Sequence, residues 1–196
     1  MSCSHGKWFT ENGICYKCRE EKISIKKKSG ILQRFFDSSF DNFVIENEVQ
    51  QSIVTSLDEF KFDKNIIMSG STGSGKTHLA NALINKMVDN GLRGFYVSFY
   101  DLSDIKINDQ IAFDRIRSCD FLIIDEYGIT DTEFKSSLLY EIIDTRYKKM
   151  KYTMVITNKS LAEFSRSIID PLKSRLKEGY ISLVCNWGDY RLKEKH

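Results

Sequence analysis

The stretch Gly70-Ser71-Thr72-Gly73-Ser74-Gly75-Lys76-Thr77 decides the fold of this chain. It fills every position of G-x-x-x-x-G-K-[S/T], the pattern of a phosphate-binding loop. Residues 65–69 before it have the length of a buried strand, and residues 78–84 after it begin a helical pattern. A chance Gly/Ser loop ahead of a helix is the alternative, and eight constrained positions in a strand–loop–helix context argue against it.

The loop predicts a nucleoside triphosphate site. Its glycines let backbone N–H groups point at phosphate oxygens, and the helix start adds the positive end of its dipole. Lys76 is expected to reach the β- and γ-phosphates, and the Thr77 hydroxyl is expected to hold Mg²⁺. The predicted nucleotide-binding residues are Gly70, Ser71, Thr72, Gly73, Ser74, Gly75, Lys76, Thr77 and His78.

A second motif lies at residues 119–126, which read Cys-Asp-Phe-Leu-Ile-Ile-Asp-Glu. Four apolar residues followed by two acids predict a buried parallel strand whose carboxylates emerge at the edge where ligands bind. Asp125 is then expected to share Mg²⁺ with Thr77, and Glu126 to orient or deprotonate the attacking water. Acids that serve only solubility are the alternative, which the nearby phosphate loop disfavours.

The remaining pattern predicts an α/β fold. Helices are expected over residues 46–60, 78–90, 101–108, 111–117, 133–149, 161–169 and 171–179, and strands over 94–99, 153–158 and 180–185. The strand between the phosphate loop and the Asp-Glu strand fits the ATPase branch of phosphate-loop proteins. Asn158 is expected to contact the γ-phosphate or the attacking water, or otherwise to cap the following helix.

Two pairs of metal-ligand residues stand near the start of the chain, Cys3 with His5 and Cys15 with Cys18. Two close pairs separated by a loop suit structural, tetrahedral Zn²⁺, and free thiols are the alternative. We predict a zinc-binding knuckle over residues 1–22, a linker and entry segment over 23–45, and a nucleotide-binding domain over 46–196.

The composition is that of an ordinary soluble protein, with 41% hydrophobic and 29% charged residues among 196. No apolar run approaches the roughly 20 residues that cross a bilayer, and the first residues lack the apolar segment of a signal peptide. We therefore expect a cytoplasmic protein without a membrane partner. Residues 1–34 carry eight basic and three acidic residues, which is compatible with a nucleic-acid or acidic-protein partner or with a solvated linker.

These motifs resemble the DnaC/DnaI helicase loaders, a branch of the AAA+ ATPases that includes the IstB-type transposition helpers. Beyond the nucleotide motifs, the resemblance covers residues 29–31, 39–43, 124–128 and the C-terminal Asn186-Trp187-x-x-Tyr190-Arg191. It implies a central parallel five-stranded sheet flanked by helices. It also implies ATP-dependent loading of a DnaB-type hexameric helicase onto single-stranded DNA, with self-association on the helicase.

The resemblance also assigns roles position by position. Residues 70–77 match Walker A, Asp125 and Glu126 match Walker B, Asn158 matches sensor 1, and Arg175 matches the sensor 2 position. The arginine that reaches a neighbour's ATP in the family falls on Pro171 here, a departure for which Lys173, Arg166 and Arg146 are candidate substitutes.

Four other functions use a phosphate loop or a core of this kind. A GTPase would read guanine with N-K-x-D, but the corresponding position is Leu161, which cannot accept guanine's paired hydrogen bonds. A small-molecule kinase would need an arginine-bearing lid that the sequence does not show. An interaction protein with a vestigial site conflicts with intact Lys76, Asp125 and Glu126. An IstB-like ATPase helper of a DNA transposase shares the same core and stays as the alternative function.

Overall fold

The computed structural model describes residues 16–128 and 133–190. Within these residues, five parallel strands form one sheet in the order β2-β3-β4-β1-β5. The strands are β1 (Asn65–Gly70), β2 (Gly94–Ser98), β3 (Phe121–Tyr127), β4 (Tyr152–Thr157) and β5 (Tyr180–Cys185). The predicted α/β fold with a parallel five-stranded sheet is confirmed.

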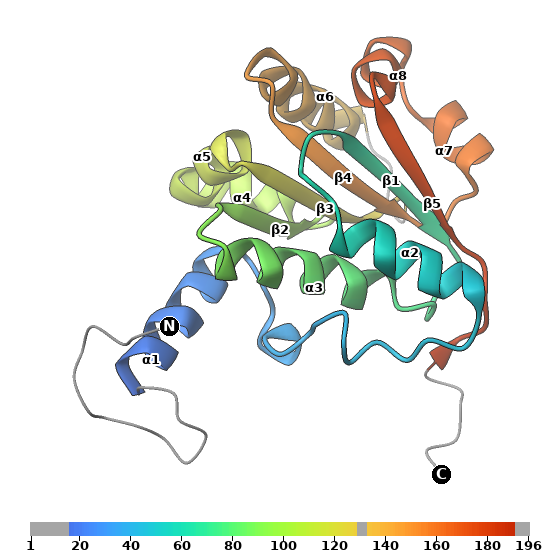
Figure 1. Ribbon diagram of the computed structural model, residues 1–196. Helices are drawn as coiled ribbons and strands as arrows, with labels where there is room; N and C mark the ends of the chain where they lie inside the picture. The colour runs from blue at the N-terminus through green and yellow to red at the C-terminus, as the bar shows by residue number, and fades with distance from the viewer. Residues whose placement is uncertain (1–15, 129–132, 191–196) are drawn as a thin grey trace.

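Helices cover both faces of the sheet (Figure 1). On one face lie α2 (Glu48–Asp58) and α3 (Lys76–Asp89). On the other lie α4 (Leu102–Asn108), α5 (Gln110–Ser118), α6 (Glu133–Lys148), α7 (Leu161–Ser167) and α8 (Asp170–Lys177). These bounds fall within about two residues of the predicted ones. None of the described helices combines the length and the apolarity needed to span a membrane.

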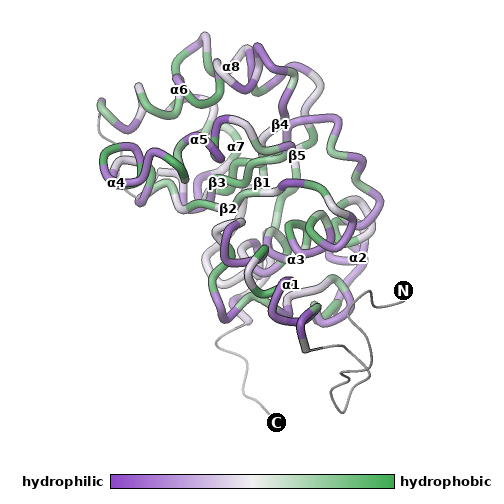
Figure 2. The backbone as a smooth tube through the Cα atoms, turned by 90° about the vertical axis from the view of Figure 1, so that its left-hand side faces the viewer, coloured by the Kyte–Doolittle hydropathy of each residue, from purple (hydrophilic) through white to green (hydrophobic). Residues whose placement is uncertain are grey.

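The strands are apolar because the sheet is buried on both faces. In β1, Ile66 and Met68 pack with α2 and α3, whereas Ile67 packs into the core on the opposite face. A strand covered by helices on both sides needs apolar residues at successive positions, so the alternation of a half-exposed strand is lost. Figure 2 shows these hydrophobic stretches gathered in the strands of the sheet.

The first described helix, α1 (Tyr16–Lys28), projects from the body and leads to a short 3-10 helix, η1 (Gln33–Phe35) (Figure 1). The chain after α1 is fixed to the sheet edge, where Tyr96 N donates to Ser29 O at 2.8 Å. Gly30 has a φ of +74°, and a Cβ there would lie 2.1 Å from Tyr96 O. The predicted boundary at residue 22 falls inside α1, which is one continuous helix.

Not every apolar residue of α2 lies on its buried face, because Val49 is 58% exposed. The polar side chain of Gln50 occupies the inward position of the first turn instead and is fully buried. Gln50 Oε1 accepts a hydrogen bond from Glu46 N, so its amide helps to fix the chain that enters α2.

Candidate functional site

The predicted phosphate loop connects β1 to α3 and lies at the carboxyl ends of the strands. Gly73 and Gly75 have φ values of +77° and +85°, which disfavour residues with a side chain. Neighbouring segments impose a second constraint. A Cβ on Gly73 would lie 1.9 Å from the carboxylate of Asp189, and one on Gly75 would lie 2.6 Å from the Phe43 ring. Both glycines are therefore required by backbone conformation and by close approach.

Lys76 is folded into the curve of the loop and is only 6% exposed. Its ammonium group donates to Gly70 O at 2.9 Å and Ser71 O at 2.6 Å. The positive charge is thus held at the centre of the loop by carbonyl oxygens.

Asp125 lies at the end of β3 and is 3% exposed. Its Oδ2 accepts from Thr77 Oγ1 at 2.8 Å and from Tyr96 OH at 2.9 Å, while Oδ1 accepts from Glu126 N at 2.7 Å. Burial raises the pKa of the Asp125 carboxyl, and the hydrogen bonds from Thr77 and Tyr96 oppose that rise. The hydroxyl of Thr77 and the carboxylate are hard oxygen ligands at close range, a donor set that fits Mg²⁺.

The next residue, Glu126, points away from the core. Its φ is +62°, which is uncommon for a residue with a side chain, and the pairing of β3 with β4 shifts register between Ile124 and Tyr127. Such an irregularity at a strand end redirects a side chain. The carboxylate is exposed, and Ser98 Oγ donates to Glu126 Oε2 at 2.9 Å. Adjacent acids therefore have different environments, one buried against Thr77 and one facing solvent.

A cavity of about 410 Å³ brings most of the predicted site together. Its lining includes the loop, the two acids of β3, and Asn158 just after β4. The lining residues are Arg34, Phe35, Thr72, Gly73, Gly75, Lys76, Thr77, His78, Asp125, Glu126, Thr157, Asn158 and Tyr190. His78 faces the entry segment as well, because its Nε2 lies 3.0 Å from Ser39 O.

The loop is held from outside by residues 186–190, whose contacts the local patterns did not predict. Trp187 Nε1 donates to Ser74 O at 2.9 Å, and Ser71 Oγ donates to Trp187 O at 2.8 Å. Tyr190 N donates to Gly73 O at 3.1 Å. Two aromatic residues with polar tips near a chain end are a signal for such contacts, since buried Trp and Tyr usually bond through those tips.

The sequence motifs also did not predict two site residues on β2. Tyr96 and Ser98 are two positions apart on a strand and so share one face, and both donate to the acids of β3. Burial first, and then the charge of Asp125, strongly raises the pKa of the Tyr96 hydroxyl, whereas the charge of Arg34 lowers it. Tyr96 is therefore a neutral hydrogen-bond donor to Asp125.

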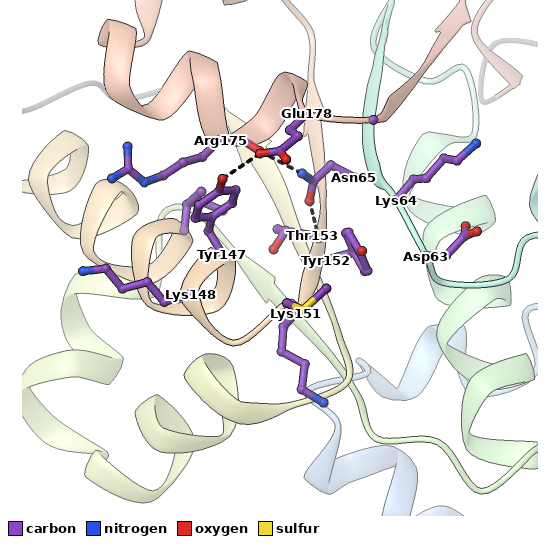
Figure 3. A pocket seen from close by; sticks show the side chains of 13 residues that line it. Asp63, Lys64, Asn65, Tyr147, Lys148, Lys151, Tyr152, Thr153, Arg175 and Glu178 are labelled. Carbon is purple, nitrogen blue, oxygen red and sulfur yellow. Dashed lines mark hydrogen bonds between the residues drawn. The ribbon is translucent and has the colours of Figure 1, made fainter.

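Arg175, which was predicted to take the sensor 2 position, does not line this cavity. Its Nε and Nη2 bind Asp144 Oδ1 at 2.8 and 2.7 Å. Its carbonyl accepts from Asn65 Nδ2 at 3.1 Å, at the start of β1, whereas the phosphate loop follows the end of β1. Arg175 lines a separate cavity of about 570 Å³ with Tyr147 and Glu178 (Figure 3).

The structure also places the three residues that were candidates to replace the family arginine at Pro171. Arg146 is fully buried and donates to Thr153 Oγ1, Tyr152 O, Ile116 O and Cys119 O. It cannot reach a neighbouring chain, so that candidate is wrong. Lys173 pairs with Asp170 at 2.8 Å, and Arg166 donates to Ala162 O within its own helix.

The predicted zinc ligands fall mostly outside the described residues. Cys3, His5 and Cys15 lie there, and Cys18 is half-buried in α1. In residues 16–128 and 133–190, no group of three or more His, Cys, Asp or Glu side chains is arranged to hold a metal.

The segment that a GTPase would use to read guanine has another task here. Ser160 caps α7 through a reciprocal pair with Glu163: Glu163 N donates to Ser160 Oγ, and Ser160 N donates to the Glu163 carboxylate. Leu161 is the first residue of the helix. A capping box at this point strengthens the case against a base-reading loop.

The chain is similar to known ATP-binding proteins. A family model described as IstB-like ATP binding protein matches residues 27–176. The chain is 28% identical over 182 residues to the replicative helicase loader DnaC of Escherichia coli K12, which covers 84% of this chain and 73% of that protein. It is 29% identical over 116 residues to an insertion sequence ATP-binding protein of Sinorhizobium fredii. That match covers 55% of this chain and 38% of the relative.

Among solved structures, a crystal structure of the DnaC helicase loader has a TM-score of 0.68 and 23% identity. The match covers 78% of this chain and 99% of that one. At this identity, the likeness supports the fold, a parallel five-stranded sheet flanked by helices, and nothing finer.

Proposed function

This chain belongs to the family of IstB-like ATP-binding proteins, and from that premise we propose that it is an ATPase that loads a DnaB-type replicative helicase onto single-stranded DNA. The observation that carries the proposal is the similarity to DnaC, which extends over 84% of this chain and 73% of the relative. The complete nucleotide site, from Lys76 to Glu126, supports the ATPase part independently.

The chain's own residues supply the parts that ATP hydrolysis needs. Lys76 and the loop N–H groups bind the phosphates, and Thr77 with Asp125 would hold Mg²⁺, which neutralises phosphate charge when it is bound. Glu126 is exposed beside Ser98 and orients or deprotonates the attacking water. Asn158 borders the same cavity and completes the polar contacts around the γ-phosphate.

Helicase loading implies two further partners, which we also propose: single-stranded DNA and other copies of this chain. The basic balance of residues 1–34 and the projecting, lysine-rich α1 support contact with the phosphates of single-stranded DNA. Self-association on the helicase follows from the same proposed function, on the similarity to DnaC. Action in replication would place the protein in the cytoplasm.

A zinc knuckle is also part of the proposal. Cys3, His5, Cys15 and Cys18 would hold one structural Zn²⁺ at the start of the chain, ahead of the entry segment and the ATPase domain. Metal analysis of the purified full chain tests this, and clearly less than about one zinc per chain would contradict it.

A second candidate function is that of an ATPase helper of a DNA transposase. The insertion sequence ATP-binding protein of Sinorhizobium fredii favours it, because it shares 29% identity with this chain. That match covers only 55% of this chain, so the helicase loader is the better-supported function.

The deciding experiment is a pull-down of a DnaB-type helicase by the full chain, with and without ATP. Retention that depends on ATP supports the loader, and no retention in either condition would refute it while leaving the ATPase intact. Lys76→Ala should abolish nucleotide binding, because it removes the cation at the centre of the loop. Glu126→Gln should bind ATP normally and lose turnover.

A further inference from the structure

Arg34 is a cation at the nucleotide site that no motif assigns. It lies on η1 and lines the same cavity as Lys76, Asp125 and Glu126. Its side chain is exposed, and its guanidinium lies 4.5 Å from the centre of the Phe35 ring. Within the described residues, this group makes no hydrogen bond or ion pair, so its donors are available to a ligand.

Other guanidinium groups of the chain are already committed. Arg93 pairs with Asp120, Arg175 pairs with Asp144, and Arg146 is buried among carbonyl oxygens. Arg34 differs from these in having its donors open while lying at the cavity wall. It is the one arginine among the described residues that line this cavity.

The backbone that carries Arg34 is fixed, although its side chain is not. Asn85, which is 5% exposed, donates through Nδ2 to Phe35 O at 3.0 Å and to Ser38 O at 2.8 Å. On the other side, Ile31 is 4% exposed in the core. A fixed backbone limits the region that the guanidinium can reach, and this lowers the entropy lost on binding.

The anchor also sets the direction from which Arg34 approaches. Thr77, Asn81 and Asn85 are spaced four residues apart on α3 and therefore share one face, and Asn81 Nδ2 donates to Thr77 O at 2.7 Å. The segment bonded to Asn85 thus lies along the face that ends at Thr77 and Asp125. Elsewhere on the loop, Tyr190 N donates to Gly73 O and the Phe43 ring lies against Gly75. Arg34 therefore approaches the cavity from the side of Thr77 and Asp125, the residues expected to hold the metal.

The charges around the cavity favour an additional cation near the phosphates of a bound nucleotide. Two carboxylates, Asp125 and Glu126, line the cavity, and the ammonium of Lys76 lies inside the loop. A triphosphate brings further negative charge to this region. A planar guanidinium suits phosphate oxygens because it offers paired donors in a fixed fork.

We propose that Arg34 binds the terminal phosphate of ATP bound to its own chain, as a substrate-contacting residue supplied by the entry segment. This rests on the proposed ATPase function. The contact distinguishes ATP from ADP, because ADP lacks the phosphate that Arg34 reaches. It also gives the entry segment, which joins α1 to the core, a direct connection to the nucleotide state.

The test measures the affinity of the full chain for a non-hydrolysable ATP analogue and for ADP, both with Mg²⁺. Arg34→Gln should weaken binding of the ATP analogue by about tenfold to a hundredfold, the range for losing a hydrogen bond to a charged group. ADP binding should change by less than about twofold, and Arg34→Lys should restore part of the ATP affinity. Arg115→Gln is the matched control, since it removes an exposed arginine on α5 and should alter neither affinity.

Three results would overturn the proposal. Equal weakening of ATP-analogue and ADP binding in Arg34→Gln would assign Arg34 a general electrostatic or structural role. Unchanged affinities would remove it from the site altogether. A wild-type chain that binds neither nucleotide would refute the proposed ATPase function, and this inference with it. Equal melting temperatures of the variant and the wild type without nucleotide exclude a folding defect.

Discussion

Replacing Tyr96 by Phe removes one hydroxyl from the buried side of the nucleotide site. In the structure this hydroxyl donates to Asp125 Oδ2 at 2.9 Å, beside the donation from Thr77 Oγ1 at 2.8 Å. The ring itself stays, so the packing of β2 is kept. The carboxylate that is expected to hold Mg²⁺ then loses one of three donors that keep it ionised and oriented.

The size of the effect follows from these contacts. A hydrogen bond to a charged group contributes about 1.5–3 kcal/mol. Thr77 and Glu126 N still hold the carboxylate, so we expect the low end, about 1.5 kcal/mol, or roughly a tenfold higher Mg²⁺ concentration for half-maximal ATP binding. Burial already raises the pKa of Asp125, and loss of the Tyr96 donor raises it further. Because Mg²⁺ requires the ionised carboxylate, the defect should grow as the pH falls.

The assay is a Mg²⁺ titration of fluorescent ATP-analogue binding at two pH values, with ATPase rate as a second readout. Tyr127→Phe is the control, because it removes a hydroxyl of similar burial that donates to Ser167 O at 3.2 Å and does not touch Asp125. A Mg²⁺ requirement in Tyr96→Phe that equals the wild type, or falls below it, would refute this reasoning.

Three further predictions concern the loop, the core and pH. Trp187→Phe removes the donor to the loop carbonyl and should weaken ATP binding severalfold with little loss of stability, as binding and denaturation measurements would show; unchanged affinity would contradict it. Arg146→Ala should lower the free energy of unfolding, measured by urea denaturation, by about 4 kcal/mol, because the substitution leaves a cavity and several unpaired buried acceptors. The control Arg115→Ala removes an exposed arginine and should change this free energy by about zero. Burial would raise the pKa of Asp120, but hydrogen bonds from Lys151 and Arg93 hold it well below its usual range. The ion pairs of Asp120 therefore stabilise the folded state at pH values above about 3.9, the pKa of Asp in the unfolded chain, and this stabilisation is lost as the pH falls. As the pH drops from about 5 to 2, the melting temperature of the wild type should fall more steeply than that of Asp120→Asn.

The sequence by itself determined the fold and the position of the nucleotide site. Residues 70–77 and 119–126 specify their local structure through their own composition, because glycines permit the loop conformation and continuous apolar runs require a sheet buried on both faces. Parallel strands bring their carboxyl ends to one edge, so Lys76, Asp125 and Asn158 were predicted to meet, and all three border one cavity. These inferences need only local pattern and the geometry of a parallel sheet.

Only the tertiary structure decided which distant residues complete the site. Tyr96 and Trp187 reach it through contacts separated from Asp125 and Ser74 by 29 and 113 positions, and no local periodicity encodes such pairs. Arg175 matched a family position in sequence, yet α8 ends at the edge of the sheet opposite the loop, where Asp144 holds it. Arg34 lines the cavity only because the hydrogen bonds of Asn85 fix the entry segment beside it, and no sequence motif predicts this contact. Side-chain direction and long-range packing, rather than residue type, determine these assignments.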